Sequence, residues 1–258
     1  MNHRKTPILP GSGECPVCHG TGLEIYKATV FDYGDPEELD FARPCTNCTG
    51  ARRLKDQTGV PDDYYSADLT KFNFRAYSTD ISKIQQVCQS MMKDFEEWNR
   101  LGKGLYIWSK TPGSGKTYLA CCLAKSLMMA HDLQMRFITA PDYISLVGDS
   151  YKRERGEEDK SQIYRTCKLL VLDDIGSQID KEWQRQELFR LTNYRIEHGG
   201  ITIYTSNLAT SSLNVDDRTK DRIIKSSIII QMPEESIRRK RAAEEQDKFL
   251  SSILREGA

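Results

Sequence analysis

The chain has 258 residues and carries 37 basic and 37 acidic side chains, so its formal charge is zero. That length allows one large core and a small additional module. A neutral chain has no overall field that draws it to nucleic acid or membrane, so contacts with polyanions must come from local patches. The sequence has no apolar run of about 18 residues and no apolar N-terminal segment typical of a signal peptide. We therefore expect a cytoplasmic protein without membrane contact.

In chain order, the first predicted element is a small loop-rich module over residues 1–57. It contains two C-x-x-C pairs, and the two-residue spacer in each lets both thiolates face one point. Four thiolates make a closed tetrahedral Zn²⁺ site, whose binding energy folds a segment that is too small for a core of its own. The expected zinc ligands are Cys15, Cys18, Cys45 and Cys48.

A redox dithiol and an iron–sulfur cluster are the alternative interpretations of these cysteines. His19 adjoins one of them, but we expect it not to bind the metal because four cysteines already complete the site. The other four cysteines occur within apolar patterns and are expected to be small core residues. They are Cys88, Cys121, Cys122 and Cys167.

Residues 58–98 are predicted to form a connector between this module and the rest of the chain. Its start, Val60–Tyr65, is expected to be extended. Apolar residues then recur about every 3.6 positions from Ile81 to Trp98, which predicts a helix that packs on the core.

Residues 99–258 are predicted to form an α/β domain, because short apolar runs alternate there with helical patterns. Buried strands separated by helices indicate a five-stranded parallel sheet with helices on both faces. The predicted strands are Gly104–Trp108, Met135–Ile138, Leu169–Leu172, Ile201–Thr205 and Ile228–Ile230. The predicted helices include Thr117–His131, Pro141–Lys152, Glu182–His198 and a closing helix from Glu234, with packing positions at Ile237, Phe249, Leu250, Ile253 and Leu254.

The most informative motif, Pro-Gly-Ser-Gly-Lys-Thr, follows the first of these strands and opens a helix. Its glycines let backbone N–H groups converge on phosphate oxygens, and the helix dipole favours the same anion. Lys116 can reach the β- and γ-phosphates, and the Thr117 hydroxyl can bind Mg²⁺. The full pattern, G-x-x-x-x-G-K-S/T, has its first glycine where this chain has Lys110. The residues expected to bind nucleotide are Pro112, Gly113, Ser114, Gly115, Lys116 and Thr117.

Further polar residues follow the later strands. Asp173 is placed to hold Mg²⁺ through its water shell, and Asp174 to orient or deprotonate the attacking water. Asn207 can hydrogen-bond that water, although a strand-end turn is the simpler interpretation when it is taken alone. Arg218 and Arg222 share one helix face, where an arginine beside a phosphate would stabilise the transferred charge and a solvated face is the alternative.

In this order the motifs resemble those of AAA+ ATPases, and in particular the bacterial helicase loaders of the DnaC/DnaI type and their relatives, the IstB-type transposition ATPases. The resemblance covers residues 58–240. The segments that carry it are Val60–Tyr65, Pro112–Thr117, Leu169–Gly176, Thr205–Leu208, Arg218–Ile223 and Ser236–Arg238. It implies an AAA+ P-loop NTPase core in which Lys116 and Thr117 bind the triphosphate and Asp173 lies beside the metal.

The resemblance also implies catalytic roles for the remaining residues. Asp174 is the catalytic carboxylate and Asn207 the first sensor. Arg222 is the arginine finger supplied to a neighbouring subunit, with Arg218 as its competitor, and Arg238 is the second sensor. The implied activity is ATP hydrolysis, with ATP, Mg²⁺ and Zn²⁺ as cofactors.

The function implied by the resemblance is ATP-controlled loading of a hexameric replicative DNA helicase. The zinc module would grip the helicase, subunits would assemble as a homo-oligomer on it, and single-stranded DNA would lie in the channel. For DNA contact the chain offers Lys152, Arg153 and Arg155 near Tyr143 and Tyr151, although the acidic residues that follow fit an ordinary solvated loop equally well. The alternatives are a transposition helper that binds duplex DNA and a transposase, and a zinc adaptor with weak ATP turnover, suggested by Lys110.

Overall fold

The structure is a computed structural model that describes residues 23–30, 37–44, 58–151, 159–176 and 181–256. The chain divides into two compact units, Met1–Gly59 and Val60–Ala258. In the first unit, β1 (Leu23–Val30) pairs antiparallel with β2 (Glu37–Pro44), from Leu23 opposite Pro44 to Val30 opposite Glu37. The prediction of a loop-rich module missed these strands. All four predicted zinc ligands lie outside the described residues.

The second unit is built on a five-stranded parallel sheet, as the sequence predicted. Its strand order is β4-β5-β6-β3-β7, so the strand that leads into the glycine-rich motif lies between β6 and β7. The strands are β3 (Gly104–Trp108), β4 (Met135–Thr139), β5 (Leu169–Asp173), β6 (Ile201–Ser206) and β7 (Ser227–Gln231). The carboxyl ends of parallel strands meet at one edge, which brings together the polar residues that follow them.

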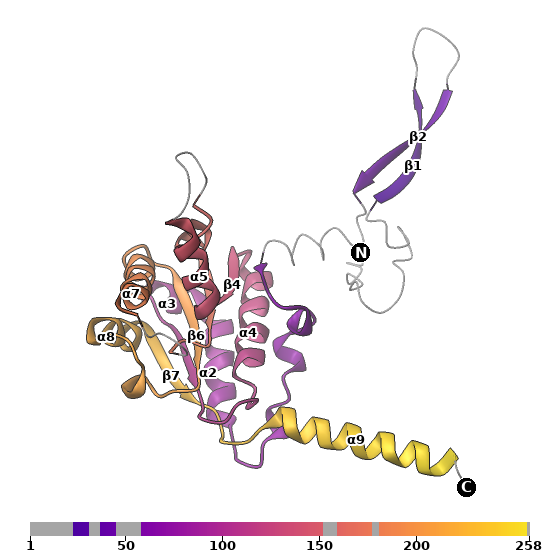
Figure 1. Cartoon of the computed structure of the whole chain (residues 1–258). Coiled ribbons are helices and arrows are strands. Elements are labelled where there is room, and N and C mark those ends of the chain that lie inside the picture. The colour runs from indigo at the N-terminus through magenta and orange to yellow at the C-terminus, as the bar shows by residue number, and fades with distance from the viewer. Residues whose placement is uncertain (1–22, 31–36, 45–57, 152–158, 177–180, 257–258) are drawn as a thin grey trace. The chain divides into compact units, whose positions relative to one another are not determined.

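Helices cover both faces of this sheet, which lies between α4 and α7 in Figure 1. Alternate strand residues point to opposite faces, so Leu105 and Ile107 enter one core cluster and Tyr106 enters the other. The first cluster contains α2 (Ser82–Lys93), α3 (Phe95–Arg100) and α4 (Lys116–His131). The second contains α5 (Ala140–Ser150), α7 (Glu182–Glu197) and α8 (Asp217–Ser226), and the short α6 (Gln162–Thr166) packs beside it.

The connector differs from its prediction at both ends. Its start is not extended but contains a 3₁₀ turn, η1 (Asp62–Tyr64), which follows Pro61 and is followed by η2 (Leu69–Lys71) and η3 (Phe74–Ala76). Short polar side chains stabilise the later turns, because Asp68 and Asn73 accept hydrogen bonds from backbone N–H groups two residues on. The predicted single helix is divided into α2 and α3 at Asp94, whose backbone leaves the helical region.

Two predictions of burial near the C-terminus were wrong. Ile228 and Ile229 are 39% and 43% exposed, because β7 is an edge strand. The closing helix, α9 (Ile237–Glu256), extends away from the sheet (Figure 1), and therefore Phe249 is 66% exposed rather than packed. Leu250 and Ile253 are similarly exposed, whereas Ile237 packs against the first core cluster. None of the helices in the described ranges is long and apolar enough to cross a membrane.

Candidate nucleotide-binding site

The glycine-rich loop between β3 and α4 has the backbone shape that its sequence requires. Gly113 and Gly115 have φ values of 77° and 92°, in the left-handed region that favours glycine. A Cβ on Gly115 would lie 2.5 Å from the Tyr77 hydroxyl oxygen, so a side chain is also excluded there by contact. Lys110 is not among the residues with positive φ, and a side chain at this position therefore imposes no backbone strain.

Lys116 begins α4 and is directed into the loop. Its ammonium group donates to the Ser109 carbonyl at 3.2 Å, the Thr111 carbonyl at 3.1 Å and the Ser114 hydroxyl at 3.3 Å. Burial lowers the pKa of Lys116, while the nearby carboxylates of Asp174 and Glu234 act in the opposite direction. The predicted phosphate-binding lysine is therefore a largely buried cation inside the concavity of the loop.

Asp173, at the end of β5, lies where the sequence predicted a metal-side acid. Its carboxylate accepts a hydrogen bond from Thr205 Oγ1 at 2.5 Å and another from the Thr117 hydroxyl. Burial raises the pKa of Asp173, and these two hydrogen bonds lower it in part. Carboxylate and hydroxyl oxygens are the ligands that Mg²⁺ prefers, so the meeting of Asp173 with Thr117 fits a magnesium ion at this position.

Asp174 and Asn207, the predicted base and first sensor, are in direct contact. Asn207 Nδ2 donates to Asp174 Oδ1 at 3.2 Å. The backbone of Asp174 has φ 54°, a conformation that aspartate tolerates better than most residues, and its N–H donates to Thr205 Oγ1 at 3.0 Å. Thr205 therefore holds both acidic residues through one hydroxyl. Sequence reasoning gave it no role, although its place at the end of the neighbouring strand was a usable signal.

Arg238, the predicted second sensor, lies against the glycine-rich loop. Its backbone N–H donates to the Gly113 carbonyl at 3.2 Å, and its side chain hydrogen-bonds the Tyr64 hydroxyl. The preceding Glu234 also binds the loop, because its carboxylate accepts from the Lys110 N–H at 3.0 Å. The sequence predicted Arg238 but not Glu234, whose partner is 124 residues away in the chain.

A cavity of about 570 Å³ opens beside the loop, within the usual size of small-molecule sites. The loop from Gly113 to Thr117 lines it. Aromatic residues of the connector and α4 also line it, and the rings of Phe72 and Tyr118 stack with centroids 5.8 Å apart. The lining further includes Tyr64, Tyr77, Arg238 and Arg241, and the acidic Asp63 and Glu245. The cavity therefore offers both phosphate-binding groups and ring surfaces against which a flat ring can pack.

The two candidate finger residues on α8 do not line this cavity. Arg218 is exposed, whereas Arg222 is half-buried with its guanidinium 5.2 Å from the centre of the Phe189 ring. The Nε atom of Arg222 is buried and has no hydrogen-bond partner among the described residues. Arg222 therefore packs against a ring of its own chain, and Arg218 is the more accessible of the two.

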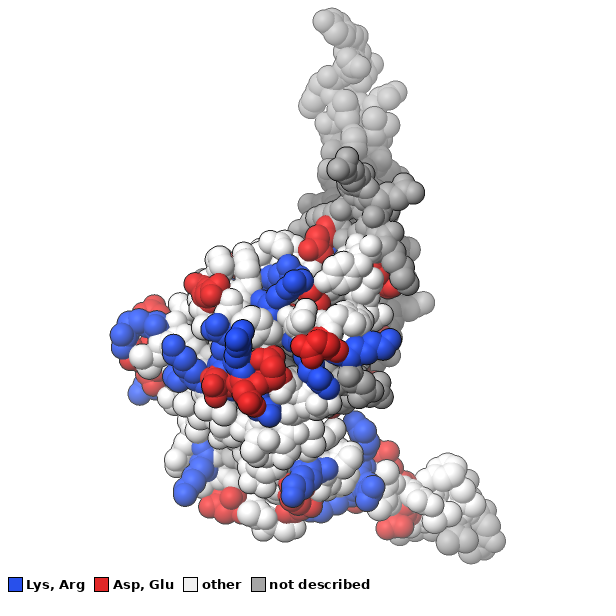
Figure 2. Space-filling model, turned by 60° about the vertical axis from the view of Figure 1, so that its left-hand side comes forward, with Lys and Arg blue, Asp and Glu red and all other residues white. Residues whose placement is uncertain are grey.

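Of the residues considered for DNA contact, the structure describes only the two tyrosines. Tyr143 is fully buried in the second core cluster and offers no ring for stacking on a base. Tyr151 is 64% exposed, and its hydroxyl donates to Glu187 at 2.6 Å. Lys152, Arg153 and Arg155 lie outside the described residues. Figure 2 shows acidic and basic side chains interspersed on the face that carries α7 and α8.

The cysteines of the second unit are core residues, as predicted. Cys88, Cys121 and Cys122 are fully buried and Cys167 is nearly so. Burial raises the pKa of Cys88 to about 12, which keeps this thiol protonated. Within the part of the chain that the structure describes, no group of three or more His, Cys, Asp or Glu side chains is arranged to hold a metal ion.

Comparison with known proteins supports this picture of the core. A family model described as IstB-like ATP binding protein matches residues 49–245. The replicative helicase loader DnaI of Bacillus subtilis (strain 168) is 27% identical over 199 residues, which are 74% of this chain and 61% of that protein. The replicative helicase loader DnaC of Escherichia coli (strain K12) is 25% identical over 121 residues, 46% of this chain and 49% of that protein.

A crystal structure of the DnaC helicase loader has a TM-score of 0.59 to this chain at 21% identity, and covers 67% of this chain and 100% of that one. This likeness establishes the fold, an α/β core with a five-stranded parallel sheet, as the sequence predicted. The chain spans about half to three fifths of the length of the two curated relatives.

Proposed function

The chain belongs to the IstB-like ATP binding proteins, and on this premise we propose that it is an ATP hydrolase that controls the loading of a hexameric replicative DNA helicase. The observation that carries the proposal is the meeting of four groups at one edge of the sheet. The Asp174–Asn207 pair and the Asp173–Thr117 pair lie beside the loop that holds Lys116. The similarity to the loaders DnaI and DnaC indicates the process that this ATP site would serve.

Each group has a role in the proposed reaction. Lys116 and the loop N–H groups bind the phosphates, and Thr117 and Asp173 hold the magnesium ion. When bound, that ion neutralises charge on the β- and γ-phosphates. Asp174 accepts a proton from, or orients, the attacking water, and Asn207 holds the Asp174 carboxylate in place through the 3.2 Å hydrogen bond. Arg238, which lines the cavity beside the loop, would stabilise charge on the transferred phosphate.

The test is a helicase-loading assay with two variants of the ATP site. Asp174→Asn keeps the phosphate-binding groups, so it should bind ATP, fail to hydrolyse it and accumulate the complex with the helicase. Lys116→Ala should bind ATP poorly and load little helicase. Full loading by Lys116→Ala would refute the proposed use of ATP, and normal turnover by Asp174→Asn would assign the base to another residue.

For the N-terminal unit, we propose that Cys15, Cys18, Cys45 and Cys48 bind Zn²⁺ and that the resulting module contacts the helicase. The strand register supports this, because Leu23 pairs with Pro44, so the two chain ends that lead to the C-x-x-C pairs emerge side by side. Elemental analysis should find one zinc per chain, lost in a Cys15→Ser/Cys18→Ser variant. That variant should also lose the helicase in a pull-down while it retains ATP binding. Zinc-free protein that still binds the helicase would contradict this role.

Subunit assembly belongs to the same proposal. We propose that the subunits form a homo-oligomer on the helicase, with single-stranded DNA in its channel and an arginine of α8 reaching a neighbour's nucleotide. Arg222 matches the finger of related ATPases, but the exposure of Arg218 favours the latter. An Arg218→Ala protein mixed with Asp174→Asn should regain one complete composite site if Arg218 acts on the neighbour. The same mixture made with Arg222→Ala distinguishes the two residues.

A second candidate function is assistance of DNA transposition, which the matched family model favours by its IstB-like character. The two functions differ in partner and in DNA. A transposition helper should enrich a transposase in pull-downs and prefer duplex DNA, whereas a loader should enrich the helicase and prefer single strands.

The third possibility, a zinc adaptor with weak ATP turnover, was suggested by Lys110. The unstrained backbone at that residue weakens it, and a turnover measurement tests it.

A further inference from the structure

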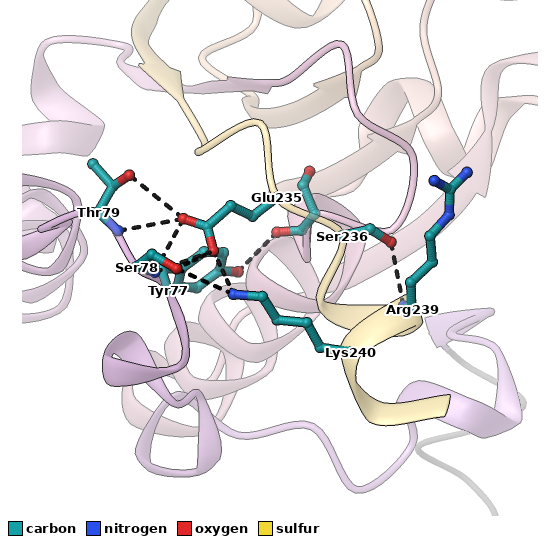
Figure 3. Close-up of polar contacts among 8 residues, drawn as sticks. Tyr77, Ser78, Thr79, Glu235, Ser236, Arg239 and Lys240 are labelled. Carbon is teal, nitrogen blue, oxygen red and sulfur yellow. Dashed lines mark hydrogen bonds and ion pairs between the residues drawn. The ribbon is translucent and has the colours of Figure 1, made fainter. Parts of the chain in front are cut away.

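Glu235, the last residue but one before α9, binds a segment of the connector that is far away in sequence. Its carboxylate accepts hydrogen bonds from the Ser78 N–H at 3.0 and 3.1 Å and from the Ser78 hydroxyl at 3.0 Å. It also accepts from the Thr79 N–H at 3.3 Å and from the Lys240 ammonium group at 2.5 Å. Figure 3 shows this carboxylate at the centre of the cluster, between the connector and the first turn of α9.

The same connector segment reaches the phosphate loop on its other side. Tyr77, next to Ser78, is buried and donates from its hydroxyl to the Ser114 carbonyl at 2.8 Å. Burial raises the pKa of Tyr77 to about 12, so the hydroxyl keeps the proton that it donates. Three consecutive connector residues therefore contact both partners: Tyr77 binds the phosphate loop, and Ser78 and Thr79 bind Glu235.

A second path leads from Glu235 back to the loop through α9. Ser236 Oγ would lie 2.9 Å from a Cβ on Gly113, and the Arg238 N–H donates to the Gly113 carbonyl at 3.2 Å. Loop, connector and helix start thus form a closed circuit of contacts. Arg238 lies on this circuit, one turn from Glu235, with its side chain at the nucleotide cavity.

We propose that Glu235 is a positioning residue for Arg238: by fixing the first turn of α9 to the connector, it sets where the Arg238 guanidinium stands relative to the phosphate loop. This inference rests on the proposed function, in which Arg238 contacts the nucleotide phosphates. The position of a long, exposed arginine depends on where its helix begins, and small displacements of a contacting group lose much of its effect on a bound phosphate. Bonds from a carboxylate to backbone N–H groups are stronger than neutral ones, which suits this task.

A simple capping role does not account for these contacts. The first turn of α9 has its own cap, because the Arg239 N–H donates to Ser236 Oγ at 3.3 Å. The bonds of Glu235 run instead to residues 156 and 157 positions away in the chain, with Lys240 as the additional partner. Hydrogen bonds from Lys240 and Ser78 lower the pKa of Glu235 to about 2, so the carboxylate is ionised at neutral pH.

The test is a double-mutant cycle on nucleotide discrimination. The full chain and its Glu235→Ala, Arg238→Ala and doubly substituted variants are titrated with ADP and with a non-hydrolysable ATP analogue. Arg238→Ala should reduce the preference for the ATP analogue about tenfold, and Glu235→Ala should reduce it in the same direction by a smaller factor. If Glu235 acts through Arg238, the double variant should match Arg238→Ala. Glu235→Gln, which keeps one acceptor oxygen, should restore part of the preference.

Glu244→Gln is the matched control, because Glu244 is an exposed acid on the same helix. It should leave the preference unchanged. The proposal is overturned if the losses of Glu235→Ala and Arg238→Ala are additive, if Arg238→Ala has no effect, or if Glu235→Ala lowers the melting temperature while the preference is kept. These results presuppose that the unsubstituted chain binds nucleotide. If it binds neither ligand, the proposed function fails together with the inference.

Discussion

Glu234 holds the start of the phosphate loop by accepting a hydrogen bond from the Lys110 N–H at 3.0 Å and another from the Thr111 hydroxyl at 2.8 Å. Two opposite effects on nucleotide binding follow from this carboxylate. It fixes the loop, but its negative charge also repels phosphate. Because Glu234 is exposed, water screens the repulsion, and we expect the fixing effect to be larger.

Replacement of this carboxylate should therefore weaken nucleotide binding. We predict that Glu234→Gln raises the dissociation constant for ATP about three- to tenfold, since a neutral amide can accept only at its single oxygen. Titration with a fluorescent ATP analogue measures the change. Tighter binding by Glu234→Gln would mean that repulsion dominates, and a Glu197→Gln variant, altered at the far end of α7, controls for the change in net charge.

Lys110 stands where the phosphate-loop pattern has its first glycine. Placing a glycine there should not strengthen nucleotide binding. The backbone of Lys110 has no positive φ, so Lys110→Gly gains no conformation that the loop needs. We predict an ATP dissociation constant within about twofold of the original and a loss of about 0.5–1 kcal/mol in unfolding free energy. Much tighter binding by the variant would show that Lys110 does limit the site. Calorimetric titration and urea unfolding measure the two quantities.

Arg195 is a buried cation whose hydrogen bonds, within the described part of the chain, go to carbonyl oxygens, a hydroxyl and a thiol. It is 1% exposed and donates to the Thr202 hydroxyl at 2.8 Å and to the Ile201 and Cys167 carbonyls at 2.7 and 2.8 Å. These bonds tie the start of β6 to the end of α7 and the residue that follows α6. Arg195→Met would leave the acceptors buried without donors.

We predict that Arg195→Met lowers the free energy of unfolding by about 3 kcal/mol or more. Chemical unfolding followed by circular dichroism measures it. The control is Arg185→Met, on the same helix, whose 3.5 Å ion pair is with the solvent-exposed carboxylate of Glu182 and whose loss should cost less than about 1 kcal/mol. Equal effects of the two substitutions would contradict the structural role of Arg195.

Glu235 should make a measurable contribution to the pH dependence of stability. Its pKa in the folded chain is about 2, below the value of about 4.3 for an unperturbed glutamate. A depressed pKa means that the folded state favours the ionised form, so the stabilisation is complete above the unfolded pKa and is lost as the pH falls towards 2. The difference in unfolding free energy between the original chain and Glu235→Gln should be constant above about pH 5 and shrink below it. A difference that does not change with pH would contradict the ionised contact.

The sheet could be predicted from sequence because its strands are apolar runs of the right length between helical patterns. The acids and Asn207 were also predictable, since each follows such a run directly. Other parts of the site depend on contacts between residues that no local pattern joins. The bond from Tyr77 to Ser114 and that from Ser78 to Glu235 belong to this group.

Some errors arose from patterns whose tertiary context was unknown. The apolar stripe at the end of α9 is like that of a packed helix, but the helix extends beyond the core that could bury it. Tyr143 was considered for DNA contact although it shares helical spacing with Ile144 and Val147, which are buried with it. That spacing was a signal in the sequence that could have placed it in the core.

The proposed function depends most directly on the binding of ATP with Mg²⁺ by the loop that contains Lys116. Calorimetric titration of the metal-replete chain measures this binding, with Lys116→Ala as the comparison. We predict saturable binding of both ATP and ADP by the original chain, and binding of ATP weakened by about tenfold or more in Lys116→Ala, because the variant lacks the buried cation. If the original chain takes up neither nucleotide, or if Lys116→Ala binds ATP equally well, the central claim is wrong.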